Sequence, residues 1–107
     1  MELQKLINRA MDLRGQYEKK EIQLYGSPST DEEIAQGLLG DVNQLIRYIS
    51  AEHGKRTIAN SQEKIEAQLA HCLWSLIVLA KMHNTDLETS FMETMDRLET
   101  HLLETRE

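Results

Sequence analysis

Two pairs of polar residues have the spacing of a ligand or metal site between helices. Asp41 and Gln44 are three positions apart, and so are Gln68 and His71. Residues three apart project from the same side of a helix, and helical bundles build metal sites from such pairs on facing helices. If the two helices run antiparallel, we expect the pairs to face each other across a cleft.

The donor atoms of these four residues decide which cation the cleft can hold. Mg2+ is held by carboxylates together with substrate phosphates, and only Asp41 is a carboxylate. The imidazole of His71 suits Zn2+, Mn2+ or Fe2+ better. Asp41 and His71 are therefore the predicted ligands of a weak metal site, with Gln44 and Gln68 as auxiliary contacts. The simpler interpretation, favoured on chemistry alone, makes His71 a partly buried histidine satisfied by one hydrogen bond.

Other residues offer little chemistry. Residues 54–61, GKRTIANS, lack periodicity and are predicted to form a loop. Its basic pair, Lys55 and Arg56, can contact a phosphate or simply remain solvated. Cys72 follows His71 but points about 100° away from it on a helix, which disfavours a nucleophile pair. No glycine-rich phosphate loop, G-x-S-x-G motif or Cys/His zinc spacing occurs, so no catalytic residue is predicted.

Length and charge narrow the classes of protein. The chain has 107 residues, which fit a single domain over 1–107. Twelve Lys and Arg against eighteen Asp and Glu give a net charge of −6, which argues against nucleic-acid binding. One cysteine permits no internal disulfide and favours a reducing compartment. The early residues lack a signal-peptide pattern and no apolar run is long enough for a bilayer, so we expect a cytoplasmic protein outside the membrane.

Apolar residues recur every three or four positions, which predicts four helices and no strand. The first helix covers about two dozen residues and ends near Tyr25, before the helix-breaking residues 26–28. The second begins at a capping box formed by Thr30 and Glu33, and Gly54 provides its stop.

The third and fourth helices repeat the capping-box spacing. Asn60 with Glu63 is predicted to open the third, and Thr85 with Glu88 the fourth. The third should end around residues 83–84. The fourth carries a narrow apolar stripe that we expect to cover one side of the core: Leu87, Phe91, Met95, Leu98 and Leu102.

The segment 68–80, QLAHCLWSLIVLA, is the centre of the predicted fold. From Cys72 to Ala80 its one polar residue is Ser75, and a helix that is apolar on every side sits inside a bundle with neighbours on several faces. Trp74 and the methionines at 82, 92 and 95 are expected to pack in the core or an interface. The predicted fold is therefore an all-α four-helix bundle.

The whole chain resembles the MazG-like, all-α nucleoside triphosphate pyrophosphohydrolases. The resemblance runs through GLLGDVNQLIRYI, a basic loop, L-A-x-x-L-W at residues 69–74 and N-x-D-L-E at residues 84–88. It implies a MazG-like bundle completed by dimerisation, as a homodimer or homotetramer. It also implies hydrolysis of a (d)NTP to a (d)NMP and pyrophosphate, with Mg2+ held by an E-E-x-x-E pattern on one helix and E-x-x-D on the next.

Several carboxylates of the family pattern are missing from this chain. The first pattern falls on Gly40, Asp41 and Gln44, and the second on Gln68 and His71. Some relatives read G-D-x-x-D in the first helix, which accounts for Gly40 with Asp41. The other changes replace two carboxylates by amides and one by histidine. In addition, acidic residues at 93 and 96 stand where many members carry basic or amide residues for phosphate.

Two functions follow as hypotheses. The first is a pyrophosphohydrolase-family protein with an eroded metal site, which uses Mg2+, Mn2+ or another transition metal if activity survives and no cofactor if it does not. In the surviving case Gln44, Gln68, Lys55 and Arg56 would contact substrate. The second is a non-catalytic helical module that binds a nucleotide or a protein, with Gln44 and Gln68 hydrogen-bonding the ligand. A ferritin-like di-iron site ranks third, because no Glu-x-x-His occurs.

Overall fold

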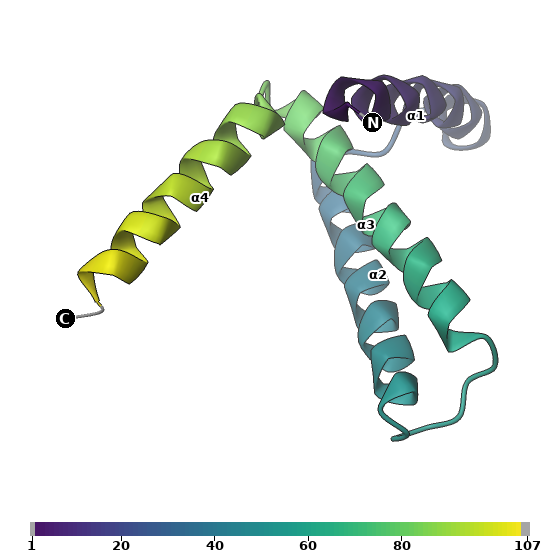
Figure 1. Cartoon of the computed structure of the whole chain (residues 1–107). Helices are drawn as coiled ribbons and strands as arrows, with labels where there is room; N and C mark the ends of the chain where they lie inside the picture. The colour runs from purple at the N-terminus through teal and green to yellow at the C-terminus, as the bar shows by residue number, and fades with distance from the viewer. Residues whose placement is uncertain (1, 106–107) are drawn as a thin grey trace.

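A computed structural model describes residues 2–105, which form four α-helices and no strand, as the sequence predicts. The helices are α1 (Leu3–Tyr25), α2 (Asp31–Glu52), α3 (Ser61–Met82) and α4 (Leu87–Glu104). Figure 1 shows α2 and α3 as a long antiparallel hairpin, with α1 crossing the C-terminal half of α3 and α4 extending away from the other three helices.

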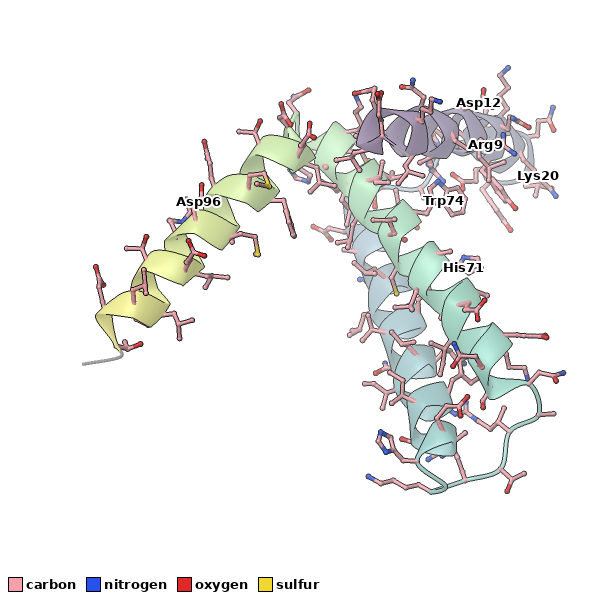
Figure 2. The ribbon with its side chains drawn as sticks, viewed as in Figure 1. Arg9, Asp12, Lys20, His71, Trp74 and Asp96 are labelled. Atoms are coloured by element: carbon pink, nitrogen blue, oxygen red, sulfur yellow. The ribbon has the colours of Figure 1, made fainter. Side chains whose placement is uncertain are left out.

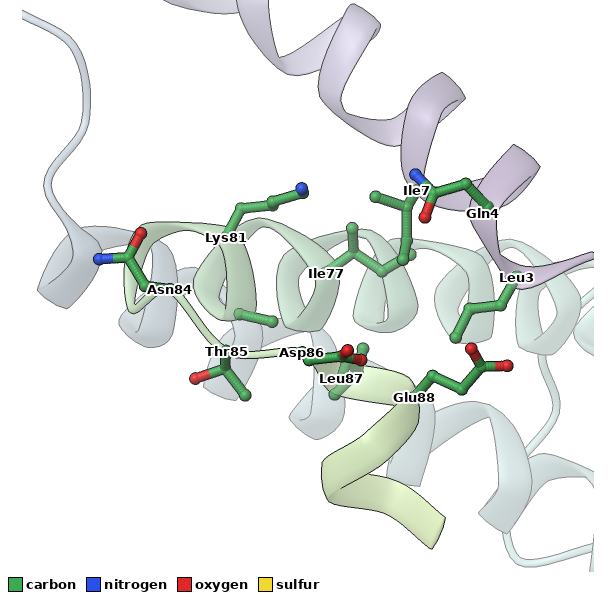
Figure 3. Close-up of a pocket in the computed structure, with 11 residues that line it drawn as sticks. Leu3, Gln4, Ile7, Ile77, Lys81, Asn84, Thr85, Asp86, Leu87 and Glu88 are labelled. Atoms are coloured by element: carbon green, nitrogen blue, oxygen red, sulfur yellow. The ribbon is translucent and has the colours of Figure 1, made fainter.

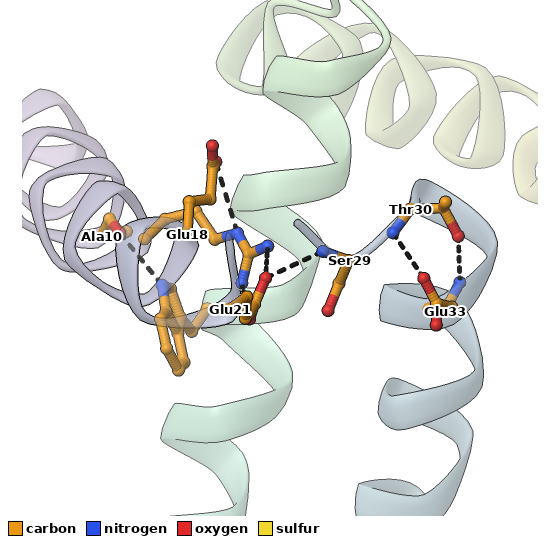
Figure 4. Close-up of polar contacts among 8 residues, drawn as sticks. Ala10, Glu18, Glu21, Ser29, Thr30 and Glu33 are labelled. Carbon is orange, nitrogen blue, oxygen red and sulfur yellow. Dashed lines mark hydrogen bonds and ion pairs between the residues drawn. The ribbon is translucent and has the colours of Figure 1, made fainter. Parts of the chain in front are cut away.

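The ends of the first two helices follow from local sequence. Gly26 closes α1 in the left-handed conformation, with φ of 84°, and its amide donates to the carbonyl of Ile22 at 2.9 Å. Glycine adopts this conformation without a Cβ clash. At the start of α2 the amide of Glu33 donates to the Thr30 hydroxyl at 3.2 Å, and the amide of Thr30 donates to the Glu33 carboxylate at 2.8 Å (Figure 4). The predicted capping box is confirmed.

The caps of the other two helices differ from the prediction. Asn60 precedes α3 in the left-handed conformation, with φ of 56°, and its side chain caps no amide. The predicted start of α3 after Asn60 is confirmed, but side-chain capping favours an extended backbone at that position, so the predicted capping box is absent. The fourth helix begins one residue later than expected, and Asp86 rather than Thr85 is its N-cap. The Asp86 carboxylate accepts from the amide of Thr89 at 3.1 Å, which lowers the pKa of Asp86.

A buried ion pair ties the end of α1 to the connection that precedes α2. The guanidinium of Arg14 donates two hydrogen bonds to the Glu21 carboxylate, at 3.0 and 2.8 Å, and the amide of Ser29 donates to the same carboxylate at 2.8 Å (Figure 4). The Arg14 side chain is only 9% exposed and that of Glu21 18%. The hydrogen bonds from Arg14 are the main cause of a lowered pKa at Glu21.

Loss of this pair should destabilise the chain. We expect Glu21→Gln to lower the free energy of unfolding by about 1.5–3 kcal/mol at neutral pH, because the buried Arg14 loses its closest charged partner and keeps only the more exposed Glu18, at 3.5 Å. The lowered pKa of Glu21 means that the pair stabilises the fold above the ordinary carboxyl pKa, and that this contribution disappears as pH falls through the folded-state pKa. In urea titrations the difference between Glu21→Gln and the wild type should therefore shrink in acid.

A matched control is Asp12→Asn, which removes the carboxylate of an exposed pair with Arg9 at 3.6 Å. This change should cost no more than about 0.5 kcal/mol at any pH. An equal loss from both substitutions would contradict the structural role of Glu21.

Trp74 joins α1 to α3. Its indole N–H donates to the carbonyl of Ala10 at 3.0 Å, and its ring meets Tyr17 edge to face with 5.5 Å between centroids. The two buried apolar residues among those described, Ile77 and Val78, lie one turn further along α3. The prediction that Trp74 packs between helices is confirmed.

Two expectations about packing are wrong for the single chain. The central helix is not surrounded, since Leu73 and Leu76 of α3 remain 41% and 47% exposed. Nor does α4 cover the core, because Phe91, Leu98 and Leu102 on its stripe are 56–60% exposed. The methionines at 82, 92 and 95 are exposed as well. The physical reason lies in the connection before α4, where left-handed Asn84 and extended Asp86 direct α4 away from α3.

Among the described residues, α3 is the one helix whose length and apolar composition would let it cross a membrane. That criterion discriminates weakly, because the core helix of a soluble protein meets it too. Here α3 packs against both α1 and α2, and the cytoplasmic location expected from the sequence stays a prediction.

Candidate functional site on the helical hairpin

Asp41 and Gln68 meet across the α2–α3 contact, as the antiparallel arrangement predicts. The Gln68 amide donates to the main-chain carbonyl of Asp41 at 3.4 Å, and both residues are half-buried. The bond engages the Asp41 backbone and not its carboxylate. Gln68 thus uses one amide proton to hold the two helices together.

Gln44 lies one turn from Asp41 on α2 and is also half-buried. Its carbonyl oxygen lies 3.5 Å from a guanidinium nitrogen of Arg47, at the outer limit of a hydrogen bond. This contact between neighbouring residues of α2 is therefore weak.

His71 belongs to a different surface from Asp41 and Gln68. It is exposed and lines a groove between α1 and α3, on the same side of α3 as Trp74 (Figure 2). The expectation of a partly buried His71 is wrong, because this groove is open to solvent. Of the two predicted metal ligands, Asp41 therefore faces α3 at the hairpin contact and His71 lines the groove against α1.

The thiol of Cys72 lies close enough to the Asp41 carboxylate for the charge of Asp41 to affect its pKa. Burial raises the pKa of the Cys72 thiol, and the negative charge of Asp41 raises it further. The thiolate is the nucleophilic form of cysteine, so this environment keeps Cys72 in its unreactive form. The hairpin therefore offers no activated cysteine at this position.

Lys55 and Arg56 lie in the loop at the tip of the hairpin (Figure 1), and both are exposed. The end of α2 at Glu52 is eleven residues beyond Asp41, a rise of about 16 Å. The basic pair is thus remote from the Asp41–Gln68 contact within one chain. If it meets a phosphate there, the phosphate must come from a long ligand or lie across a second chain.

The residues present do not fit a Mg2+ ion within one chain. Over residues 2–105 no group of three His, Cys, Asp or Glu residues is placed to hold a metal ion. At the hairpin contact a single carboxylate, that of Asp41, is accompanied by two amides. Mg2+ requires more anionic oxygen than this set supplies.

A pocket that the sequence did not point to lies where the N-terminus of α1 meets the connection between α3 and α4 (Figure 3). Its volume is about 400 Å3. Ile7 and Ile77 supply apolar walls, and Lys81, Thr85 and Glu88 supply polar groups. The motif at residues 84–88 was the available signal, since a turn rich in polar residues beside two helix ends can form a recess.

Comparison with protein-family models, with curated proteins and with solved structures finds no match to this chain.

Proposed function

We propose that this chain is a MazG-like helical protein that keeps the scaffold of a nucleoside triphosphate pyrophosphohydrolase without its hydrolytic metal site. In this proposal it is a non-catalytic module that binds a nucleoside triphosphate at the α2–α3 hairpin. The observation that carries the proposal is the bond from the Gln68 amide to the Asp41 carbonyl, at 3.4 Å. A neutral amide stands there in place of a carboxylate and serves the packing of the helices.

The amides of Gln44 and Gln68 are the groups proposed to contact the ligand. Each carries two N–H donors and one acceptor, and Gln68 spends one donor on Asp41. The remaining amide donors and acceptors can form hydrogen bonds with a base edge, a ribose hydroxyl or a phosphate oxygen. Amides discriminate little between metal-bound and metal-free phosphate, so binding should not require Mg2+.

Thermal unfolding with and without nucleotide tests this function. We expect a (d)NTP to raise the melting temperature to the same extent with Mg2+ and with EDTA, because a ligand that binds the folded state stabilises it by mass action. In Gln68→Glu the rise should be lost, since a carboxylate repels the phosphates. Gln36→Glu, at an exposed position of the same hairpin, should retain it. A rise that appears only with Mg2+ would contradict the proposal.

A residual hydrolase is the second candidate, and the position of the Asp41 carboxylate favours it. The Gln68 bond leaves that carboxylate uninvolved, and its charge acts on Cys72. In this candidate Asp41 would hold the cation, in a weak Mg2+ or Mn2+ site.

The protein is further proposed to be a homodimer or homotetramer in the cytoplasm. Exposed apolar residues on α2 and α3 support self-association, because monomeric proteins rarely leave large apolar patches in water. They are Leu39, Val42, Ile46, Ile49, Leu69 and Leu76. A second hairpin laid against this surface would complete a four-helix core.

The oligomeric state can be measured by light scattering on the full chain. We expect a dimer or larger species at micromolar concentration, and dissociation on Ile46→Glu, which places a charge within the apolar surface. Gln36→Glu adds the same charge elsewhere on α2 and should leave the mass unchanged. A wild-type monomer would rule out this part of the proposal.

A further inference from the structure

Helix α4 carries an apolar stripe that remains exposed among the residues that the structure describes, 2–105. Phe91, Met95, Leu98 and Leu102 recur every three or four residues and are 39–60% exposed. Figures 1 and 2 show α4 extending away from the other helices. A stripe of this kind on a stable helix is normally buried against another surface.

A groove of matching character lies between α1 and α3. Its volume is about 550 Å3, and its lining is mainly apolar. Leu6, Ala10 and Leu13 from α1 lie opposite Leu73 and Trp74 from α3. Arg9 lies at its edge (Figure 2). The stretch from Leu6 to Tyr17 and that from Phe91 to Leu102 each contain twelve residues, a rise of about 16 Å from end to end, so three turns of α4 match the groove in length.

The net charges of the helices favour docking of α4 in this groove over docking on the apolar surface of the hairpin. Helix α4 has five acidic residues and one basic residue, a net charge of −4. Helix α1 has five basic and three acidic residues, a net charge of +2, whereas α2 has one basic and five acidic residues, a net charge of −4. An acidic helix is attracted to α1 and repelled by α2.

The connection between α3 and α4 is held in a conformation that keeps α4 away from its own groove. Asn84 is left-handed, with φ of 51°, and the Asp86 carboxylate caps α4. Next to them, the His83 side chain contacts the Asp31 carboxylate of α2 at 3.1 Å. In this conformation the α4 stripe does not reach the groove of its own chain, so we take the groove that receives it to belong to a second molecule.

We propose that α4 of one copy of this chain docks into the α1–α3 groove of a second copy. A two-fold axis makes the exchange reciprocal, so each chain both donates a helix and receives one. The proposal rests on the apolar stripe, the groove and the charges of the helices. It stands whether or not the hairpin binds a nucleotide.

Cysteine trapping between differently tagged chains tests the exchange. Both chains carry Cys72→Ala, which removes the single native cysteine. One chain also carries Leu13→Cys at the middle of the groove, and the other carries Met95→Cys or Leu98→Cys at the middle of the stripe. Central positions meet whichever way α4 runs: Leu13 comes closest to Leu98 if α4 is parallel to α1, and closest to Met95 if it is antiparallel. The matched control is Thr100→Cys, on the opposite side of α4.

We expect oxidation of the mixed chains to give a covalent heterodimer with one of the two stripe cysteines at least tenfold more efficiently than with the control, because disulfides need Cα atoms within about 7 Å. No heterodimer, or equal yields from stripe and control, would overturn the proposal. A single chain with both cysteines that links only to itself would also overturn it, since its own groove would then hold α4.

Discussion

Replacing Trp74 by alanine is expected to lower the free energy of unfolding by about 2–4 kcal/mol, less than the full cost of deleting a core aromatic because Trp74 is half-buried and lines the open groove. The indole packs edge to face on Tyr17 and donates to the carbonyl of Ala10. Both contacts join α1 to α3, and the groove between these helices would lose one of its walls. Urea unfolding followed by circular dichroism measures the loss.

Two further substitutions separate the contributions of Trp74. Trp74→Phe keeps an aromatic ring but removes the indole N–H, so it should cost less than the alanine change, about 1–2 kcal/mol. Tyr25→Ala removes an exposed aromatic residue at the end of α1, 78% accessible, and should stay within about 0.5 kcal/mol of the wild type. A loss below about 1 kcal/mol for Trp74→Ala would mean that α1 is not held through this residue.

Adding carboxylates to the hairpin is expected to create a cation site. In Gln44→Glu combined with Gln68→Glu, three carboxylates would share the contact between α2 and α3, because Gln68 already reaches Asp41 and Gln44 lies one turn away. Hard divalent cations bind such oxygen clusters. We expect affinity for Mn2+ to rise at least tenfold, measured by calorimetry, and stability without metal to fall because like charges repel.

His71→Asp tests whether residue 71 lies near the hairpin contact, as the resemblance to the MazG-like family implies, or away from it, as in the structure. The pattern makes this position a metal ligand, whereas the structure places His71 at the groove against α1. Added to the two glutamate substitutions, His71→Asp should therefore change Mn2+ affinity less than twofold. Gln36→Glu with Gln62→Glu adds the same charge at exposed positions and should change it little. Failure of the paired substitution to bind Mn2+ would contradict the expected clustering of these three side chains at the hairpin contact.

Local signals were sufficient for the start of α2 and the end of α1. The Thr30–Glu33 spacing and Gly26 each act within one turn, so no distant contact can override them easily. Asn60 shows the limit of such signals, because asparagine favours both N-caps and the left-handed conformation, and the residue type alone does not decide between them.

The candidate site was predictable only in part. An antiparallel hairpin was enough to bring Gln68 to Asp41. However, residues three apart still differ by about 60° around a helix. On α3, which contacts α2 on one side and α1 on another, that difference assigns Gln68 and His71 to separate surfaces. The sequence also identified the stripe on α4, but a stripe does not state what covers it, and the direction of α4 depends on the connection at residues 83–86.

The central claim, a MazG-like scaffold without hydrolysis, is tested most directly by pyrophosphate release. The wild type and Asp41→Ala should be incubated with a panel of deoxynucleoside triphosphates, once with Mg2+ and once with Mn2+. We predict no release above the protein-free rate from either chain with either metal, because one carboxylate and two amides supply less anionic oxygen than a catalytic divalent cation requires. Turnover by the wild type that Asp41→Ala abolishes would contradict this account and identify a working enzyme.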